Sequence, residues 1–342
     1  MADTPTTVGF AGAGWVTVIH GMAAGAFDDV RVGPVASRHP EHAARRATQV
    51  GGEPVGYEAV PGAADAVIVA TPPALHRREA ERAVDGGATV LVETPLAATL
   101  ADADALVAEA ASGRLGYGEN LVHSPVVAEA VGACRRMGDL THLEVRFSQA
   151  RPEGGDDRTA AAWGGGAGFD LGIHAVALAL LMAAPARVTG VTATLLRGDD
   201  IEVDDDATLT LAFDSGLTAQ VRATWRAAAP VWDAQAASAT SAVRVELVPD
   251  PSVELNGSPL RVPRPPTGLP TEQLHHLGYL DQMGALAADA AARRQPRVGP
   301  DLGRMLLDIV CAAYASVRTG EPETVPFTGP RHRTPHELWT GG

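Results

Sequence analysis

The feature that most constrains the fold is an alternation of short β-type runs with longer helical runs in the first third of the chain. Runs typical of buried strands occupy residues 8–13, 30–37, 64–71 and 89–94. The helical segments between them end near glycines, for example at Gly86. Because parallel strands need crossovers of about a dozen residues or more, this alternation predicts a Rossmann domain, a doubly wound parallel sheet, over residues 1–122.

The pattern changes after residue 122. A very apolar helix is predicted around residues 174–183, and β-type runs then follow one another within residues 186–257, two of them separated by a turn sequence at 214–216. This order predicts an α/β domain over residues 123–342, with a largely antiparallel open sheet and helices on one face. The C-terminal helices are assigned to this second domain, and the alternative is that they pack back on the first domain.

Composition argues against several classes of function. The formal net charge of the 342 residues is -14, whereas nucleic-acid binding requires clustered cations. The 27 Lys and Arg residues are all arginine, so the chain contains no lysine. Only Cys134 and Cys311 are present, in unrelated contexts, and they predict neither a metal site nor a disulfide framework.

The N-terminus and the apolar runs predict a cytoplasmic protein that does not bind membranes. No basic region precedes the apolar segment at the N-terminus, so no signal peptide is expected. The longest apolar run, around Ala175 to Ala184, is about half of the ~20 residues that a membrane span needs.

The sequence 12-GAGWVT-17 links the first predicted strand to a helix and forms two thirds of a dinucleotide-binding fingerprint. Gly12 allows the tight turn, and Gly14 lets a pyrophosphate approach the backbone at the helix N-terminus. Thr17 occupies the position of the usual third glycine, and an ordinary glycine-rich turn is the alternative interpretation. The predicted cofactor-binding residues of this turn are Gly12, Ala13, Gly14, Trp15 and Val16.

The end of the second predicted strand indicates which dinucleotide is bound. NAD sites carry an acidic residue here that holds the ribose 2′-hydroxyl, whereas this chain has Ser37 followed by Arg38. A hydroxyl and a guanidinium suit a 2′-phosphate better than a free diol. We therefore predict NADP as the cofactor, with NAD as the alternative. The interpretation of this pair as an ordinary polar loop stays open.

Taken together, the motifs resemble those of the Gfo/Idh/MocA oxidoreductases, the family of glucose–fructose oxidoreductase and inositol dehydrogenase. The resemblance covers nearly the whole chain. The matching segments are 8-VGFAGAGWVTVIH-20, 67-VIVATPPALH-76, 90-VLVETPL-96, 119-ENLVHSP-125, 163-WGGGAGFDLGIH-174 and 311-CAAYASVRTGEP-322. The resemblance implies a Rossmann domain, an α/β domain whose open sheet often mediates dimers or tetramers, and a site between the two domains.

The resemblance also implies roles for individual residues. Pro95 lies in a turn that is commonly cis in this family. Asp170 and His174 occupy the positions where the family places its substrate-orienting and acid/base groups. The ribose–nicotinamide side of the cofactor is implied to be lined by Thr71, Pro72 and His76. Glu93 and Thr94 are implied to lie beneath the nicotinamide, and Asn120 to face the same region. Trp163 is implied to approach the cofactor from the second domain.

The spacing of Asp170 and His174 adds to this implication. Four residues apart, they share one face if the segment is helical, so that a carboxylate and an imidazole point the same way. The unperturbed pKa of histidine lies close to neutrality, which suits general acid/base catalysis. The alternative is a helix N-cap aspartate and a buried histidine, and the family context decides for catalysis. The acidic run 204–206 is expected to form a solvated turn, since it lacks the ligand spacing of a calcium loop.

Thr94 is the main departure from the family, which has a lysine here that works with the reacting carbonyl or alcohol. Threonine exchanges hydrogen bonds but carries no charge at neutral pH. Three interpretations stay open. His174 is the sole acid/base; or the substrate, such as a protonated imine or a conjugated acceptor, reduces the need for a protein acid; or the site no longer transfers hydride.

The resulting hypothesis is an NAD(P)-dependent oxidoreductase acting on a small polar substrate, sugar- or cyclitol-like by resemblance. The substrate is a keto or alcohol compound, an imine or a conjugated acceptor, and the predicted catalytic residues are His174, Asp170 and Thr94. A non-redox enzyme (lyase, hydrolase or cyclase) and a nucleotide-sensing regulatory protein are the alternatives. A homodimer or homotetramer formed through the C-terminal sheet is expected.

Overall fold

The computed structural model describes residues 4–153 and 156–341. The chain divides into two units, and it enters each of them more than once. The sequence prediction placed one division after residue 122, and the first unit also takes in a later segment of the chain. The first unit consists of Met1–Ala97, Asp102–His123 and Pro265–Arg304, and the second of Ala98–Ala101, Ser124–Arg264 and Met305–Gly342.

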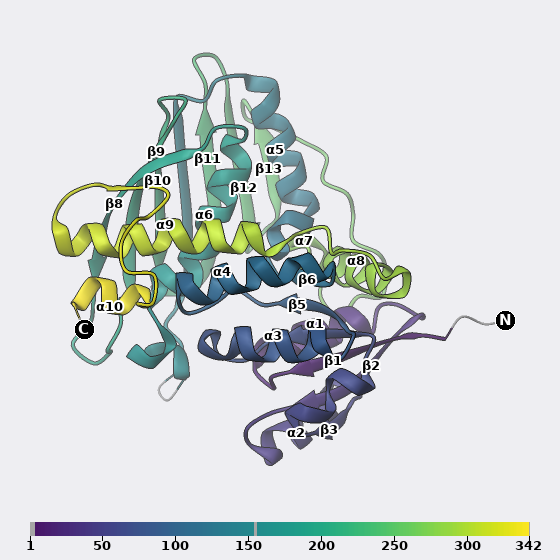
Figure 1. Cartoon of the computed structure of the whole chain (residues 1–342). Coiled ribbons are helices and arrows are strands. Elements are labelled where there is room, and N and C mark those ends of the chain that lie inside the picture. The colour runs from purple at the N-terminus through teal and green to yellow at the C-terminus, as the bar shows by residue number, and fades with distance from the viewer. Residues whose placement is uncertain (1–3, 154–155, 342) are drawn as a thin grey trace. The chain divides into compact units, whose positions relative to one another are not determined.

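The first unit is built on a six-stranded parallel sheet, drawn in purple and blue in Figure 1. The strand order β3-β2-β1-β4-β5-β6 is that of a Rossmann fold, which confirms the predicted doubly wound sheet. The strands are β1 (Thr6–Ala11), β2 (Val30–Ala36), β3 (Glu53–Val55), β4 (Ala66–Val69), β5 (Thr89–Val92) and β6 (Leu115–Tyr117). Every residue of β4 and β5 is buried, as expected for strands in the middle of a parallel sheet.

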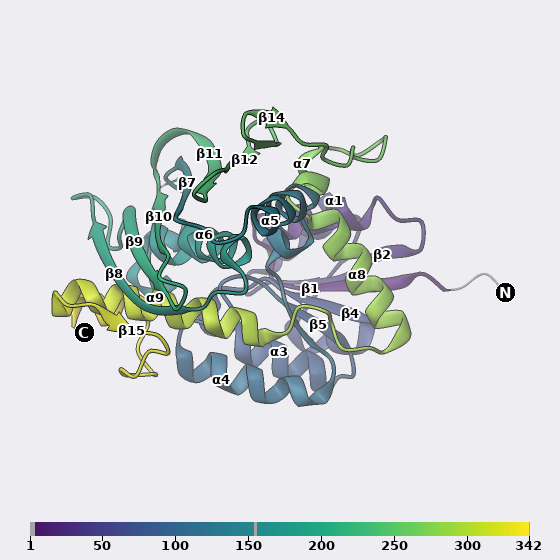
Figure 2. The same ribbon diagram turned by 90° about the horizontal axis from the view of Figure 1, so that it is seen from above.

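Helices cover this sheet and begin and end where the sequence favours it. In α2, Pro40 stands in the first turn, where its missing N–H costs nothing, and Gly51 ends the helix in the left-handed region with φ 75°. Helix α8 lies beside α1 in Figure 2, and its Leu286 joins the core around Phe10 and Ile68. The helices are α1 (Trp15–Ala24), α2 (Pro40–Val50), α3 (His76–Asp85), α4 (Leu100–Glu109), α7 (Gln273–His276) and α8 (Tyr279–Ala292).

The second unit contains a nine-stranded sheet in the order β14-β13-β12-β11-β7-β10-β9-β8-β15. Only β7 and β10 pair in parallel, so the sheet is largely antiparallel, as predicted. The strands are β7 (His142–Ala150), β8 (Val188–Leu196), β9 (Asp206–Phe213), β10 (Thr218–Thr224), β11 (Arg226–Ala237), β12 (Ala242–Val248), β13 (Ser252–Leu255), β14 (Ser258–Pro259) and β15 (Glu323–Thr324).

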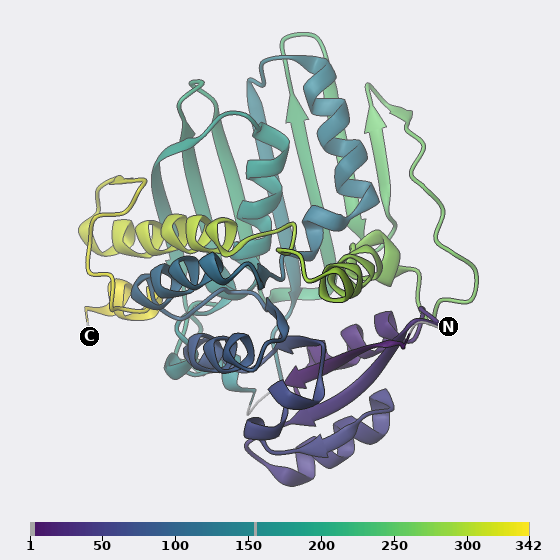
Figure 3. The same cartoon turned by 45° about the vertical axis from the view of Figure 1, so that its right-hand side comes forward.

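Helices α5 and α6 pack on one face of this sheet, α5 over β12 and β13 and α6 over β7 and β10, as Figure 3 shows. Ser124 is the N-cap of helix α5, and its hydroxyl accepts a hydrogen bond from the Val127 N–H at 3.2 Å. The helices are α5 (Pro125–Met137), α6 (Ala167–Ala183), α9 (Pro300–Thr319, in this unit from Met305) and α10 (Pro335–Thr340). Short 3-10 turns are η1 (Tyr57–Ala59), η2 (Pro61–Ala63), η3 (Pro73–Leu75), η4 (Ala110–Ser112), η5 (Asn120–His123), η6 (Asp157–Thr159) and η7 (Ala161–Trp163).

The stretch Ala161–Ala183 is longer than the apolar run noted in the sequence. Among the described residues it is the one segment that length and composition alone would allow to cross a membrane. Of its most apolar window, 78% is buried inside the protein, and the core helix of a globular domain passes the same test.

Sequence patterns do not predict β11, because the alanines and Pro230 in RAAAPVWDAQAA disfavour a strand. The strand forms because β7 and β12 pair with it on its two sides, and Pro230 falls where the pairing with β7 is irregular. The expectation of a solvated turn at residues 204–206 is wrong. All three aspartates are buried; Asp205 forms an ion pair with Arg226 of β11, and Asp206 with Arg222 of β10.

Candidate active site

The turn between β1 and α1, residues 12–16, has the backbone of a pyrophosphate site. Gly12 adopts φ 130°, and a Cβ there would lie 2.2 Å from the Ala70 carbonyl oxygen, so only glycine fits. A Cβ on Gly14 would meet nothing closer than 4.0 Å. Gly14 is the N-cap of α1 and no side chain caps that helix end, so its backbone N–H groups are open to an anion.

The neighbours of these glycines fit a bound dinucleotide. Thr17, in the position of the third glycine, is buried, and its hydroxyl donates to the Gly12 carbonyl at 3.1 Å. The threonine therefore stabilises the turn without obstructing it. Trp15 is 70% exposed beside the turn, while Ala13 and Val16 are half-buried.

Ser37 and Arg38 directly follow β2. Arg38 is exposed, and Ser37 is half-buried with its hydroxyl accepting a hydrogen bond from the His39 N–H at 3.2 Å. A residue that the sequence analysis does not single out, Arg46 of α2, donates from Nε to the Ala13 carbonyl at 3.1 Å. A guanidinium thus lies beside the turn between β1 and α1.

The Thr94 turn, residues 93–96, follows β5. From Ala88 to Ala98 every residue is buried except Thr94. The peptide bond between Thr94 and Pro95 is cis, as the resemblance implies. Glu93 is buried, contacts the His20 ring at Nε2 and accepts a hydrogen bond from the Thr94 N–H at 3.1 Å. Of the two residues predicted to lie beneath the nicotinamide, Thr94 is therefore the one open to a ligand.

His76 is turned towards the protein, and its implied contact with the cofactor stays a prediction. The ring is buried, with Nδ1 2.9 Å from the Pro95 carbonyl oxygen and Nε2 2.7 Å from the Thr71 carbonyl oxygen. Burial lowers the pKa of His76, while the carbonyl contacts and the charge of Glu93 act in the opposite direction. The Thr71 hydroxyl is buried without a partner among the described residues, and Pro72 is half-buried.

Asn120 is buried as well. Its side-chain amide donates to the Leu277 carbonyl at 2.7 Å, between α7 and α8. This contact fixes the segment after β6 to a part of the chain that lies 157 residues away. The predicted contact of Asn120 with the nicotinamide region stays a prediction.

In the second unit, α6 presents the predicted carboxylate and imidazole. From Gly164 to Ala179 every residue is buried except Asp170 and His174. They lie one turn apart on the same helix, so the prediction of a shared face is confirmed. Gly166 is the N-cap of α6, which removes the alternative of an N-cap aspartate. The His174 ring is nearly parallel to that of Trp232, with centroids 6.3 Å apart.

Arg158 is the charged neighbour of this pair, and no motif in the sequence predicts it. Its Nη1 lies 3.5 Å from Asp170 Oδ2. The same guanidinium is held by Asp156, through Nε at 3.0 Å and Nη2 at 2.8 Å. Burial raises the pKa of Asp170, and the charges of Arg158 and His174 oppose that shift.

The start of α6 is fixed by Asp204. Its carboxylate accepts hydrogen bonds from the N–H groups of Gly166 at 2.9 Å and Gly168 at 2.8 Å, and from the Tyr314 hydroxyl at 2.5 Å. Burial raises the pKa of Asp204, opposed by these bonds. Trp163 directly precedes the glycines 164–166 that lead into α6, and its indole N–H is buried without an acceptor among the described residues.

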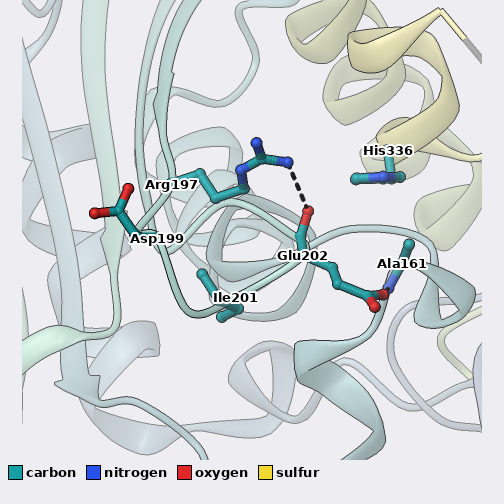
Figure 4. Close-up of a pocket in the computed structure, with 7 residues that line it drawn as sticks. Ala161, Arg197, Asp199, Ile201, Glu202 and His336 are labelled. Carbon is teal, nitrogen blue, oxygen red and sulfur yellow. Dashed lines mark hydrogen bonds between the residues drawn. The ribbon is translucent and has the colours of Figure 1, made fainter.

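A polar pocket of about 500 Å³ lies in the same unit, and no residue predicted from the sequence lines it. Arg197 donates to the Glu202 carbonyl at 3.4 Å, as Figure 4 shows, and the Glu202 carboxylate accepts from the Ala161 N–H at 2.8 Å. Burial and the charge of Arg197 lower the pKa of His336 on the pocket wall. The lining residues are Ala161, Arg197, Gly198, Asp199, Ile201, Glu202 and His336.

Comparison with known proteins identifies the family. Residues 6–118 match the family model described as an oxidoreductase family with an NAD-binding Rossmann fold, and residues 128–257 match the GFO/IDH/MocA C-terminal domain. The chain belongs to the Gfo/Idh/MocA oxidoreductase family. Among the solved structures, GenD2 from gentamicin A biosynthesis in complex with NAD shares the fold with a TM-score of 0.83 and 23% identity, covering 95% of this chain and 97% of that one.

Relatives within the Gfo/Idh/MocA family are named for reactions on sugars. The dTDP-3,4-didehydro-2,6-dideoxy-alpha-D-glucose 3-reductase of Actinomadura kijaniata is 31% identical over 63% of this chain and 66% of its own length. The D-xylose 1-dehydrogenase (NADP(+)) 2 of Haloferax volcanii is 29% identical over 64% of this chain and 68% of its own length. The chain thus spans about two thirds of the length of these relatives.

Proposed function

We propose that this protein is an NADP-dependent reductase of a ketone group on a small sugar-like molecule. One observation carries the proposal: the segment from Gly164 to Ala179, most of it in α6, is buried except for a carboxylate and an imidazole one turn apart. Such a pair suits proton transfer to or from a reacting oxygen. The substrate class rests on the relatives, which are named for reducing a keto-sugar nucleotide and for oxidising xylose.

The first unit fits the dinucleotide in three places. The uncapped N-terminus of α1 at Gly14 would hold the pyrophosphate. Ser37 and Arg38 would bind a 2′-phosphate, and the absence of an acidic residue from 37-SRHP-40 favours NADP over NAD. Thr94, the only residue of its buried run that is open, would face the nicotinamide. When bound, the reduced nicotinamide supplies the hydride that forms the new C–H bond, and it is thereby oxidised.

The residues of the second unit complete the reaction. As the C–H bond forms, the π electrons of the carbonyl move to its oxygen, which then takes a proton from a ring nitrogen of His174. Asp170 stabilises the imidazolium before that transfer, and solvent returns the proton to His174 afterwards. Arg158 supplies positive charge near the oxygen, a role that the uncharged Thr94 cannot fill. This mechanism corresponds to the first of the three interpretations of Thr94, in which His174 is the sole acid/base.

The test has two stages. Tryptophan fluorescence measures the binding of NADPH and NADH, and absorbance at the nicotinamide band then follows oxidation of bound NADPH by a panel of keto-sugars and dTDP-linked keto-sugars. We expect tighter binding of NADPH and turnover of at least one keto-sugar. The variant His142→Gln serves as a control, because it changes an exposed histidine of the second unit, the unit that also contains His174. Its turnover should persist.

Other outcomes identify the rival functions. Tight nucleotide binding without oxidation of NADPH by any compound of the panel would indicate a nucleotide-sensing protein. Conversion of a substrate without consumption of NADPH would indicate a non-redox enzyme. Either outcome contradicts the proposal.

A further inference from the structure

Two buried histidines converge on the Thr94 turn. His20 reaches it from α1 and His76 from α3, and their exposed fractions are 0% and 1%. Burying an imidazole removes its hydrogen bonds to water, and the protein must replace them. Here the groups that replace water lie at the two ends of the Thr94 turn: the Glu93 carboxylate for His20, and the Pro95 and Leu96 carbonyls for His76.

His20 acts on the turn through Glu93. The His20 Nε2 contacts one carboxylate oxygen of Glu93, and the other oxygen accepts the Thr94 N–H at 3.1 Å. Because a carboxylate is an acceptor, the proton of His20 lies on Nε2. The edge of the ring meets Tyr279, with centroids 5.5 Å apart and planes at 83°. The backbone of Thr94 is thereby linked to α1 by two successive hydrogen bonds.

His76 acts on the turn through the backbone. Its Nδ1 lies 2.9 Å from the Pro95 carbonyl oxygen and 3.3 Å from that of Leu96, while Nε2 faces the Thr71 carbonyl at 2.7 Å. A neutral imidazole has one N–H, so the ring donates a hydrogen bond either to the Thr71 carbonyl or to the Pro95 and Leu96 carbonyls, depending on its tautomer. In both cases the ring packs against both segments. The loop after β4 and the turn after β5 are therefore tied through one side chain.

This arrangement leaves a single side chain of the segment that is not buried. Among residues 88–98 only the Thr94 side chain is not buried, so the two histidines fix the backbone on both sides of the one position that a ligand can reach. We infer that His20 and His76 are positioning residues that fix the Thr94 turn against the nicotinamide end of the cofactor. The inference rests on the proposed function, since it presumes that a nicotinamide dinucleotide binds.

The test compares two ligands that share only one end. NADPH carries a nicotinamide, whereas adenosine 2′,5′-bisphosphate carries the adenosine 2′-phosphate end alone. In His20→Ala and His76→Ala we expect NADPH affinity to fall about tenfold or more, the effect of losing one oriented hydrogen bond, and affinity for the bisphosphate to change less than about twofold. His20→Gln and His76→Gln, whose amides still donate, should recover part of the loss. The control is His123→Gln, a half-buried histidine of the same unit.

Equal losses for both ligands, or no loss for either, would overturn the inference, because a general structural role does not distinguish the two ends. If the wild-type protein bound neither ligand, the proposed function would fail by itself. The histidines would then be judged by ¹⁵N NMR of their rings in the free protein at neutral pH. A slowly exchanging ring N–H on both residues would then show only that the histidines hold the turn, and exchange as fast as in the exposed His332 would contradict even that role.

Discussion

The Thr94 turn in the first unit and helix α6 in the second are both buried segments that open only at predicted site residues. They differ in what they present and in what holds them. The Thr94 turn presents a neutral hydroxyl and is held by buried histidines. Helix α6 presents Asp170 and His174 beside a guanidinium and is held at its start by a buried carboxylate.

The difference concerns which of the two units carries the ionisable side chains of the predicted site. In the family pattern that the sequence resembles, the Thr94 position is a lysine, so the turn after β5 carries charge. Here Thr94 is uncharged and the Glu93 carboxylate is engaged within the protein. By contrast, Arg158, Asp170 and His174 stand on the second unit. In the proposed mechanism, the Rossmann unit keeps the geometry of its cofactor turn, and the ionisable groups stand on the other unit.

Replacing His174 with glutamine should have the largest effect on catalysis and tests this comparison directly. Loss of a general acid typically costs about 10²- to 10⁴-fold in kcat. Thr94→Ala removes one neutral hydrogen-bonding group and should cost about tenfold or less. Steady-state kinetics with the best keto-sugar measure both, with His142→Gln as the control. If Thr94→Ala were as damaging as His174→Gln, the chemistry would depend on the first unit after all.

Asp204→Ala should give the largest loss of stability, and the loss should be confined to the second unit. The change leaves two backbone N–H groups and the Tyr314 hydroxyl without their buried acceptor, which we expect to lower the free energy of unfolding by about 3 kcal/mol or more. Urea unfolding followed by circular dichroism measures this loss. NADPH binding by the first unit should be retained.

The matched control is Asp214→Ala. Asp214 also accepts a backbone hydrogen bond, from the Arg187 N–H at 2.9 Å, but it lies at an exposed turn. Its loss should cost less than about 1 kcal/mol, since water replaces the bond. Equal destabilisation by the two variants would mean that Asp204 does not hold the start of α6.

The parts of this structure that local patterns determine were predictable from the sequence. The alternation of strand and helix periods predicts the parallel sheet, and the spacing of Asp170 and His174 predicts their common face. The glycines of the β1–α1 turn are local as well, because φ 130° at Gly12 is a property of one residue and its immediate backbone.

The residues that position the site were not predictable in this way, because their partners are distant in the chain. Glu93 and His20 are 73 residues apart, and Asp204 lies 38 residues from Gly166. The run 204–206 has the composition of a solvated turn. It is buried because the start of α6 and helix α9 pack beside it. Strand β11 likewise depends on its two neighbours.

Arg38→Ala should have a smaller effect, confined to the cofactor end of the first unit. Loss of one guanidinium from a 2′-phosphate site should weaken NADPH binding by about tenfold and leave NADH binding unchanged. Fluorescence titration of both nucleotides measures the ratio of the two affinities. Arg45→Ala, at an exposed position of α2, is the control. Equal weakening of NADPH and NADH would show that Arg38 does not recognise a 2′-phosphate.

The smallest expected effect concerns the pH dependence of stability in the first unit. Burial lowers the pKa of His76 below its ordinary value of 6.5, so on acidification the unfolded chain takes up this proton before the folded protein does. The free energy of unfolding should therefore fall as pH drops below about 6.5, and level off once the folded pKa is passed. His76→Gln should reduce that slope, by at most about 1.4 kcal/mol per pH unit, while His332→Gln at an exposed position should not. Urea unfolding between pH 7.5 and 5.5 measures the slopes. An unchanged slope in His76→Gln would mean that the ring is not held as a buried neutral imidazole against the Thr94 turn.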